Sequence, residues 1–117
     1  MKSIFLNKEG ASPKNKILDF LIVYQEFDYS LKDIAKFSKV SYSSMKSLKN
    51  ELIKDKWIVL TRTIGKAQMY KLNVNSKKVS KFIDFYWSVV ESENEEPQKS
   101  EYVQSGKVAV PVSAKNF

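Results

Sequence analysis

The 117-residue chain contains no cysteine, no histidine, three glycines and one arginine, Arg62, among 20 basic residues. Without cysteine or histidine it cannot form a Ser-His-Asp or Cys-His nucleophile, a thiolate-imidazole zinc site, a haem attachment or a redox dithiol. Its sparse glycines form no Gly-rich phosphate loop, and its dispersed carboxylates form no metal signature. We therefore expect a protein that is not an enzyme and uses no metal or cofactor.

Long apolar runs are also missing. The longest is Phe20–Tyr24, far short of the ~20 residues that a membrane-spanning helix requires. The N-terminus lacks a signal-type apolar core followed by small residues. We expect a cytoplasmic protein with no membrane contact, whose length allows one core without disulfides.

Positive charge is in excess. The formal net charge is +7, with 17 Lys/Arg and 8 Asp/Glu in residues 1–90 and three Lys and five Glu in residues 91–117. A basic body with a mildly acidic end suggests a polyanionic partner. The alternative is that the charge only keeps the protein in solution.

Three serines suited to helix N-caps divide the first half of the chain: Ser12, Ser30 and Ser41. Pro13 takes the first helical position after Ser12. Apolar residues at helical spacing follow each serine, which predicts helices over about 13–26 and 42–55 with a short helix between them. Two short helices joined by a tight turn form a helix-turn-helix.

Segments 57–64 and 67–74, rich in β-branched and aromatic residues, flank Gly65-Lys66 and predict a β-hairpin. A two-residue turn would pair Leu60 with Lys71. A three-residue loop would collect apolar residues on one face, pairing Ile58 with Val74, Leu60 with Leu72 and Arg62 with Tyr70. We expect the three-residue loop, because one face must be buried.

A last helix over 76–90, capped by Ser76, has the cleanest amphipathic stripe in the chain. Since the preceding elements already form a closed core, we expect it to join two subunits of a homodimer. The dimerisation residues would be Phe82, Ile83, Tyr86, Trp87 and Val90. Packing against the chain's own first helix is the alternative.

The two ends of the chain carry weaker signals. No element is assigned to the N-terminal segment, residues 1–12. From Glu91 the composition becomes polar and acidic, and we expect a largely disordered tail over 91–117. Its apolar cluster, Val108–Val112, either docks on the body or a partner, or belongs to an idle tail.

The order helix, helix-turn-helix, hairpin, helix resembles winged helix-turn-helix domains of bacterial and archaeal transcriptional regulators, over residues 13–75. Ile34-Ala35 matches the family's apolar-alanine pair, and Val40-Ser41 its valine-serine start of the recognition helix. Later core positions are matched by Met45, Leu52 and Ile58. Lys56 stands where the family usually has glycine; a left-handed conformation there would cost roughly 1 kcal/mol. The resemblance implies a mainly α fold with a small β-hairpin (α+β) and double-stranded DNA as partner.

The third helix would then be the recognition helix. With Met45, Leu48 and Leu52 facing the core, its opposite side presents Tyr42, Ser43, Lys46, Ser47, Lys49 and Asn50. Lys46 can donate to guanine and Asn50 can bond adenine, while the hydroxyls can contact base edges or phosphates. A face that is polar only because it is solvated is the alternative.

Other basic residues would grip the DNA backbone. Arg62 and Lys66 lie near the hairpin tip, where Arg62 can enter a narrow A·T-rich minor groove. Further lysines flank the first helix start and the turn, and some of them would contact phosphates, the alternative for each being a solvent-facing charge: Lys14, Lys16, Lys32, Lys36 and Lys39. The function predicted is sequence-specific DNA binding, most simply by a transcriptional regulator. The alternatives are a plasmid or viral replication or partition factor and a winged-helix protein–protein adaptor.

Overall fold

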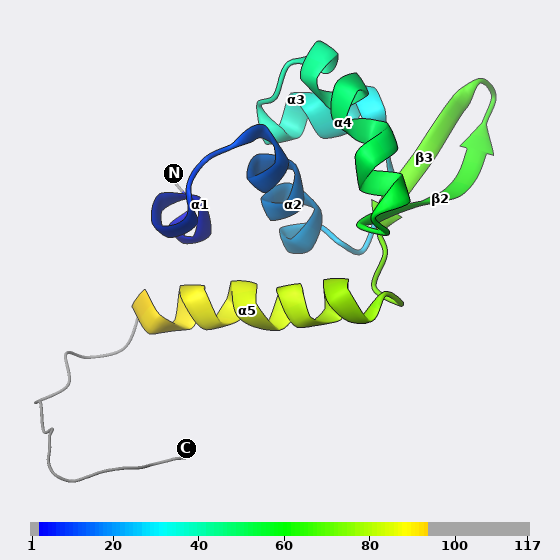
Figure 1. The fold of residues 1–117 in the computed structure, drawn as a ribbon. Helices are drawn as coiled ribbons and strands as arrows, with labels where there is room; N and C mark the ends of the chain where they lie inside the picture. The colour runs from blue at the N-terminus through cyan, green and yellow to red at the C-terminus, as the bar shows by residue number, and fades with distance from the viewer. Residues whose placement is uncertain (1–2, 94–117) are drawn as a thin grey trace, which may run out of the picture.

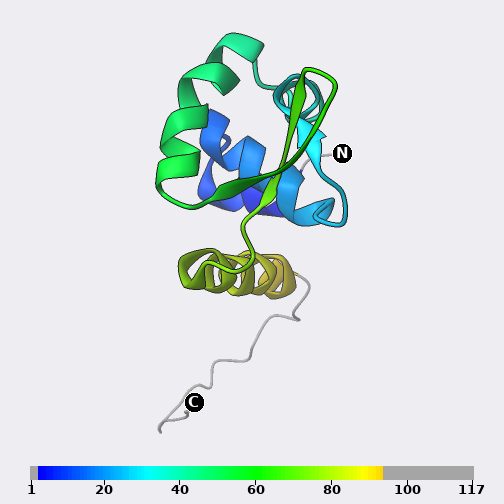
Figure 2. The same cartoon turned by 90° about the vertical axis from the view of Figure 1, so that its right-hand side faces the viewer.

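A computed structural model describes residues 3–93, which form five helices and a three-stranded antiparallel sheet (Figures 1 and 2). In chain order the elements are α1 (Ile4–Glu9), α2 (Pro13–Val23), β1 (Tyr29–Ser30), α3 (Leu31–Ser38), α4 (Tyr42–Lys54), β2 (Ile58–Ile64), β3 (Ala67–Leu72) and α5 (Lys77–Glu93). The described residues form a mixed α+β fold, which confirms the predicted fold class. The predicted start of the disordered tail at residue 91 is wrong, because residues 91–93 belong to α5; from position 94 onward the predicted tail lies outside the described residues.

Serine caps begin α2, α3 and α4, as the sequence predicted. The side-chain oxygens of Ser12, Ser30 and Ser41 accept from the backbone N–H groups three residues further on. These bonds satisfy N–H groups that have no partner within the helix. The helix ends differ from the prediction in α2, which stops at Val23, in α3, which continues through Ser38, and in α5, which continues to Glu93 rather than to residue 90.

Two lysines end helices in the left-handed conformation, Lys39 after α3 (φ 62°) and Lys56 after α4 (φ 64°). After α4, the Trp57 N–H donates to the Leu52 carbonyl at 2.8 Å and the Lys56 N–H to the Ile53 carbonyl at 3.0 Å. This pair of bonds is the Schellman motif. The position where the resembled family has glycine therefore takes the left-handed form here with a lysine, at an energetic cost.

The hairpin register corrects the sequence prediction. Near the turn the pairs are Arg62 with Met69, Thr63 with Gln68 and Ile64 with Ala67; beyond a bulge at Thr61 they are Ile58 with Leu72, Val59 with Lys71 and Leu60 with Tyr70. The expected three-residue loop is wrong: Gly65-Lys66 is a two-residue turn, with Gly65 at φ 61° as in a type II′ turn. The bulge, not a longer loop, brings the buried positions onto one face.

A third strand was not predicted. β1 is only two residues long and pairs with β3, placing Tyr29 opposite Tyr70 and giving the strand order β1-β3-β2. Val74, expected in the hairpin, lies beyond the end of β3 and is exposed. Figure 1 shows the β2–β3 hairpin reaching away from the helices.

The core draws on every helix and on the hairpin. Among its most deeply buried side chains are Phe5, Ile17, Leu21, Ile34, Met45, Leu52, Ile58 and Val79. Phe5 explains the unpredicted α1, because its ring lies between those of Phe82 (5.6 Å) and Tyr86 (4.8 Å). Burial of this ring, together with the Ser3 cap and the packing of Ile4 and Leu6 on the core, stabilises a six-residue helix that would be too short to form alone.

α5 packs on its own chain. In Figures 1 and 2 it lies along one side of the molecule, across from α3 and α4. Tyr86 is buried, and Phe82, Ile83 and Val90 are half-buried against the core. Of the five residues predicted to form a dimer interface, Trp87 alone is exposed, at 40%. Four of them thus take the intramolecular alternative. None of the helices within residues 3–93 is long and apolar enough to cross a membrane.

Candidate nucleic-acid interface

α4 buries one face and exposes a polar one. Met45 and Leu52 are fully buried and Leu48 is half-buried. The exposed residues from the predicted reading face are Tyr42, Ser43, Lys46, Ser47 and Asn50. This arrangement agrees with the spacing of the apolar residues. The sixth residue of the predicted face, Lys49, is half-buried and points its ammonium group toward the ring of Tyr70, 5.9 Å from the ring centre.

A cleft of about 360 Å³ lies between α4, the hairpin and the start of α3. Three lysines line it, each from a different element: Lys32 of α3, Lys49 of α4 and Lys66 of the hairpin turn. Tyr42, Ser30 and Tyr70 complete much of the wall. The start of α3 adds the positive end of a helix dipole. The cleft therefore concentrates positive potential beside the exposed face of α4.

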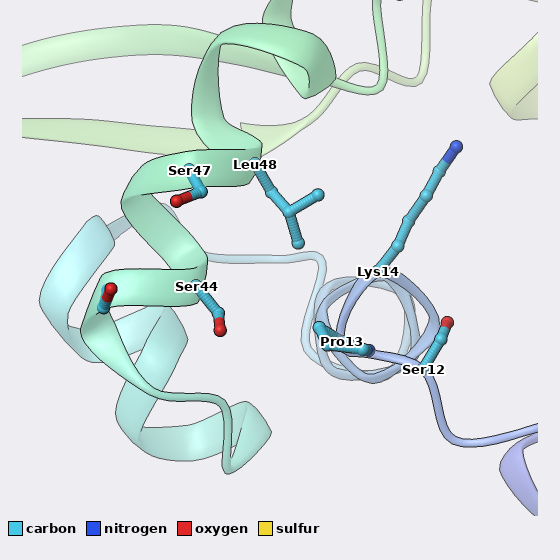
Figure 3. A pocket seen from close by; sticks show the side chains of 7 residues that line it. Ser12, Pro13, Lys14, Ser44, Ser47 and Leu48 are labelled. Atoms are coloured by element: carbon cyan, nitrogen blue, oxygen red, sulfur yellow. The ribbon is translucent and has the colours of Figure 1, made fainter.

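A second groove, of about 310 Å³, separates α4 from the first turn of α2. In Figure 3, Ser44, Ser47 and Leu48 come from α4, and Ser12, Pro13 and Lys14 from the start of α2. Hydroxyl groups and an ammonium group beside a helix N-terminus suit the oxygens of an anion. Ser12 and Ser44 were not among the predicted site residues. The available signal was the density of serines between 41 and 47.

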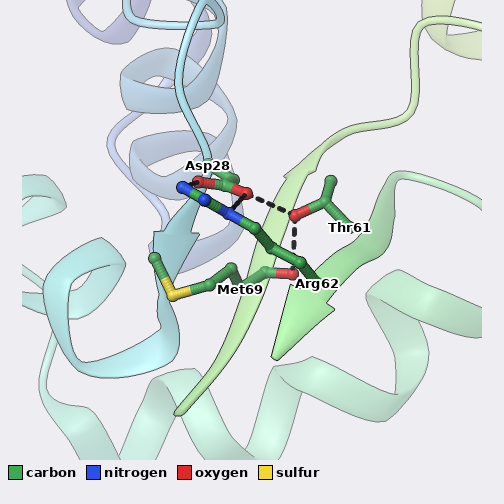
Figure 4. A network of polar contacts seen from close by, with 4 residues as sticks. All are labelled: Asp28, Thr61, Arg62 and Met69. Atoms are coloured by element: carbon green, nitrogen blue, oxygen red, sulfur yellow. Dashed lines mark hydrogen bonds and ion pairs between the residues drawn. The ribbon is translucent and has the colours of Figure 1, made fainter. Parts of the chain in front are cut away.

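Arg62 is engaged by a carboxylate. Its Nε and Nη2 donate to Oδ2 and Oδ1 of Asp28 at 2.8 and 3.0 Å, and Thr61 Oγ1 donates to Oδ2 at 2.6 Å (Figure 4). Hydrogen bonds from Arg62 and Thr61 lower the pKa of Asp28 to about 2, and Asp28 raises the pKa of Arg62. This three-residue clasp joins the hairpin to the loop before β1.

The clasp places Arg62 differently from the prediction. Arg62 pairs with Met69 in the strand ladder, set back from the turn that carries Lys66. Its side chain remains 61% exposed while that of Asp28 is 12% exposed. Two of the five N–H donors of the guanidinium are used by Asp28. Sequence reasoning missed Asp28 because it lies 34 positions before Arg62.

The structure brings most of the other predicted residues to one side of α4. Tyr42, Lys49, Lys66 and Lys32 share the first cleft. Ser43 and Ser47 share the second groove. Lys46 and Asn50 lie exposed on α4, with the Lys46 ammonium 5.3 Å from the centre of the Tyr42 ring. Lys39 is exposed in the turn before α4.

Comparisons with known proteins gave no relative to set beside this geometry. No family model matches the chain, and searches of curated proteins and of solved structures found no match. The arrangement of α4, the two grooves and the clasp is therefore the basis of the functional proposal.

Proposed function

We propose that this chain binds double-stranded DNA sequence-specifically, with α2, α3, α4 and the hairpin acting as a winged helix-turn-helix. One observation carries the proposal: the exposed polar face of α4 borders a cleft to which three elements each contribute a lysine. A helix fits the major groove of B-DNA, and lysines beside it neutralise phosphates. A face that was merely solvated would not need lysines converging from α3, α4 and the hairpin.

In this proposal α4 reads bases. Lys46 donates to guanine O6 or N7, and Asn50 bonds the adenine edge through its amide. Tyr42 and Ser43, on the first turn of α4, reach base edges or phosphates. Ser47 faces the groove toward α2, where Ser12 and Lys14 add phosphate contacts.

The backbone grip comes from the surrounding lysines. Lys32 and Lys66 line the same cleft beside α4, and Lys39 lies in the turn before that helix. Lys66, at the hairpin turn, contacts the adjoining minor groove or its phosphates. Arg62 orients the hairpin through Asp28 and offers its remaining donors to the backbone.

The biological role proposed is transcriptional regulation in the cytoplasm by occupation of a promoter site. A replication or partition factor would use the same interface, and the location of the target sequences distinguishes the two. A protein–protein adaptor is disfavoured because the exposed α4 face and its cleft carry Lys46, Lys49 and Lys66.

A homodimer is part of the proposal, with an interface smaller than the whole stripe of α5. Phe85 and Trp87 are 46% and 40% exposed on that helix. Because residues two positions apart project to different sides of a helix, the interface would centre on Trp87, and two-fold pairing through it would set two α4 helices one DNA turn, about 34–36 Å, apart. Sedimentation velocity would show a dimer that Trp87→Ser weakens; a monomer at all concentrations would remove this part of the proposal.

The central test is selection of bound sequences from random duplexes, followed by footprinting with purified protein. We expect one enriched motif. Asn50→Ala should relax the preference at one base position of that motif and weaken the binding free energy by about 1–3 kcal/mol. Lys81→Ala, an exposed lysine of α5, serves as the control and should leave the motif unchanged. Absence of any enriched motif would refute sequence-specific binding.

A further inference from the structure

An aromatic cleft opens on a part of the surface to which α4 and the hairpin contribute nothing. Phe20 and Tyr24 of α2, Tyr29 of β1 and Phe37 of α3 line about 360 Å³. The ring centres of the other three lie 4.8 to 5.7 Å from that of Phe20. The volume is within the range of clefts that bind small ligands or peptide side chains.

The cleft is fixed in shape yet open. The Tyr29 hydroxyl donates to the backbone carbonyl of Tyr24 at 3.2 Å, which holds β1 against the end of α2. Tyr24 and Phe37 are nevertheless 55% and 53% exposed. In the same stretch of chain, Val23 and Phe27 are also exposed. Exposed aromatic surface around a cleft, such as that of Tyr24 and Phe37, marks a site of interaction.

We propose that residues 108–112 of the same chain, Val-Ala-Val-Pro-Val, occupy this cleft. They are the longest apolar run in residues 94–117. Pro111 fixes its own backbone torsion and disfavours helical geometry at Val110. Extended segments that contain proline are the natural ligands of aromatic-lined grooves, because little chain entropy is lost when they bind.

The chain is long enough to make this contact with itself. α5 ends at Glu93, whose carboxylate pairs with the Lys8 ammonium group at 3.1 Å. Fourteen residues separate Glu93 from Val108, and fully extended they span roughly 45–50 Å. A domain of this size is roughly 30 Å across. Tethering over that distance gives an effective concentration near the millimolar range, so even a weak contact is populated.

The charges near the cleft are mixed, so the proposal rests on the apolar segment and the length of the chain rather than on charge. Lys36 places its ammonium group 5.8 Å from the centre of the Phe37 ring, while Glu26 and Asp28 act on Tyr29. The intervening residues 94–107 contain three Glu and two Lys. Because the cleft lies apart from α4 and the hairpin, the proposal does not depend on DNA binding.

The absence of cysteine makes a direct test possible in the full-length chain. Ser113→Cys carries a single nitroxide immediately after the proposed ligand, and amide signals of the 15N-labelled protein report which surface it approaches. We expect the signals of Tyr24, Tyr29 and Phe37 to lose about half or more of their intensity relative to the reduced sample, as a populated intramolecular contact requires. Replacing Val108, Val110 and Val112 by Ser in the labelled chain should restore them.

Each other result overturns the proposal. Loss of signal over α4 and the hairpin would mean that the tail lies on the basic face instead. Uniform intensities would mean that residues 108–112 have no preferred site. A mixture of nitroxide-labelled protein at natural isotope abundance with 15N-labelled protein that carries no nitroxide tests whether a second copy of the chain supplies the segment. If the cleft signals lost as much intensity in this mixture as in the protein that carries both labels, another chain would be the source.

Discussion

The phenol of Tyr86 donates to Oδ1 of Asp19 at 2.6 Å and so joins α5 to α2 across 67 positions of sequence. The same oxygen accepts from Ser3 Oγ at 2.7 Å, just before α1. One carboxylate oxygen therefore ties three helical regions together. Burial raises the pKa of Tyr86 well above its ordinary value of 10.0, with a further contribution from Asp19. The phenol stays protonated, and hence a donor, throughout the neutral pH range.

Tyr86→Phe should lower the free energy of unfolding by about 1–3 kcal/mol, because it removes a hydrogen bond to a charged acceptor in a part-buried site. Urea unfolding at pH 7 measures the change. Tyr42→Phe is the matched control, since Tyr42 is 47% exposed and makes its contacts on the outer face of α4. Equal effects from the two substitutions would contradict this account of α5 docking.

Lys56→Gly should stabilise the protein by about 0.5–1 kcal/mol. The left-handed backbone at Lys56 penalises a residue with a Cβ, and glycine removes that penalty while losing some entropy on folding. Lys54→Gly, two residues earlier at the last position of α4, changes the same residue type but should destabilise by about 0.5–1 kcal/mol. A thermal or urea unfolding series that gave both variants the same sign would be inconsistent with the Schellman ending.

The Asp28 clasp predicts a pH-dependent contribution to stability. Because the folded pKa of Asp28 is about 2 and its ordinary value is 3.8, its contribution is fully present above the ordinary value and is lost as the pH falls toward 2. Wild type should therefore be more stable than Asp28→Asn at neutral pH, with the difference shrinking between about pH 5 and pH 2. Unfolding midpoints across this range test it; a constant difference would argue against the ion pair.

Lys66→Ala should weaken DNA binding at low salt and reduce the slope of log K against log salt by about 1, which corresponds to one lost phosphate contact. Fluorescence anisotropy titrations at several salt concentrations measure both quantities. Lys81→Ala carries the same change in charge on α5 and should leave the slope as it is. If both variants changed the slope alike, overall charge rather than the hairpin turn would determine binding.

The sequence predicted the local elements well where local bonds define them. Ser12, Ser30 and Ser41 each begin a helix, because a cap depends on residues within three positions. α1 was missed because its stability comes from Phe5 packing against α5, far along the chain. The predicted hairpin register was wrong because the bulge at Thr61 shifts the strand pairing by one residue, and the alternation of apolar and polar residues does not reveal such a bulge.

The candidate site also has a part that the sequence predicted and a part that it did not. Exposure of Lys46 and Asn50 follows from the spacing of buried residues on α4 and was predictable. The convergence of Lys32, Lys49 and Lys66 depends on how three elements meet, which spacing cannot give. Equally, only the folded chain brings Asp28 to Arg62 and so sets the orientation of the hairpin.

The bulge at Thr61 also divides the hairpin into two units that can change separately. Below it, Ile58, Tyr70 and Leu72 are buried and cannot vary freely. Above it and beyond the clasped Arg62, positions 63–68 form a short exposed ladder with its own register. Residues could be exchanged, or added in matched pairs, in the outer unit without repacking the interior. Substitutions that alter the exposed hairpin tip therefore need not lower the stability of the folded domain.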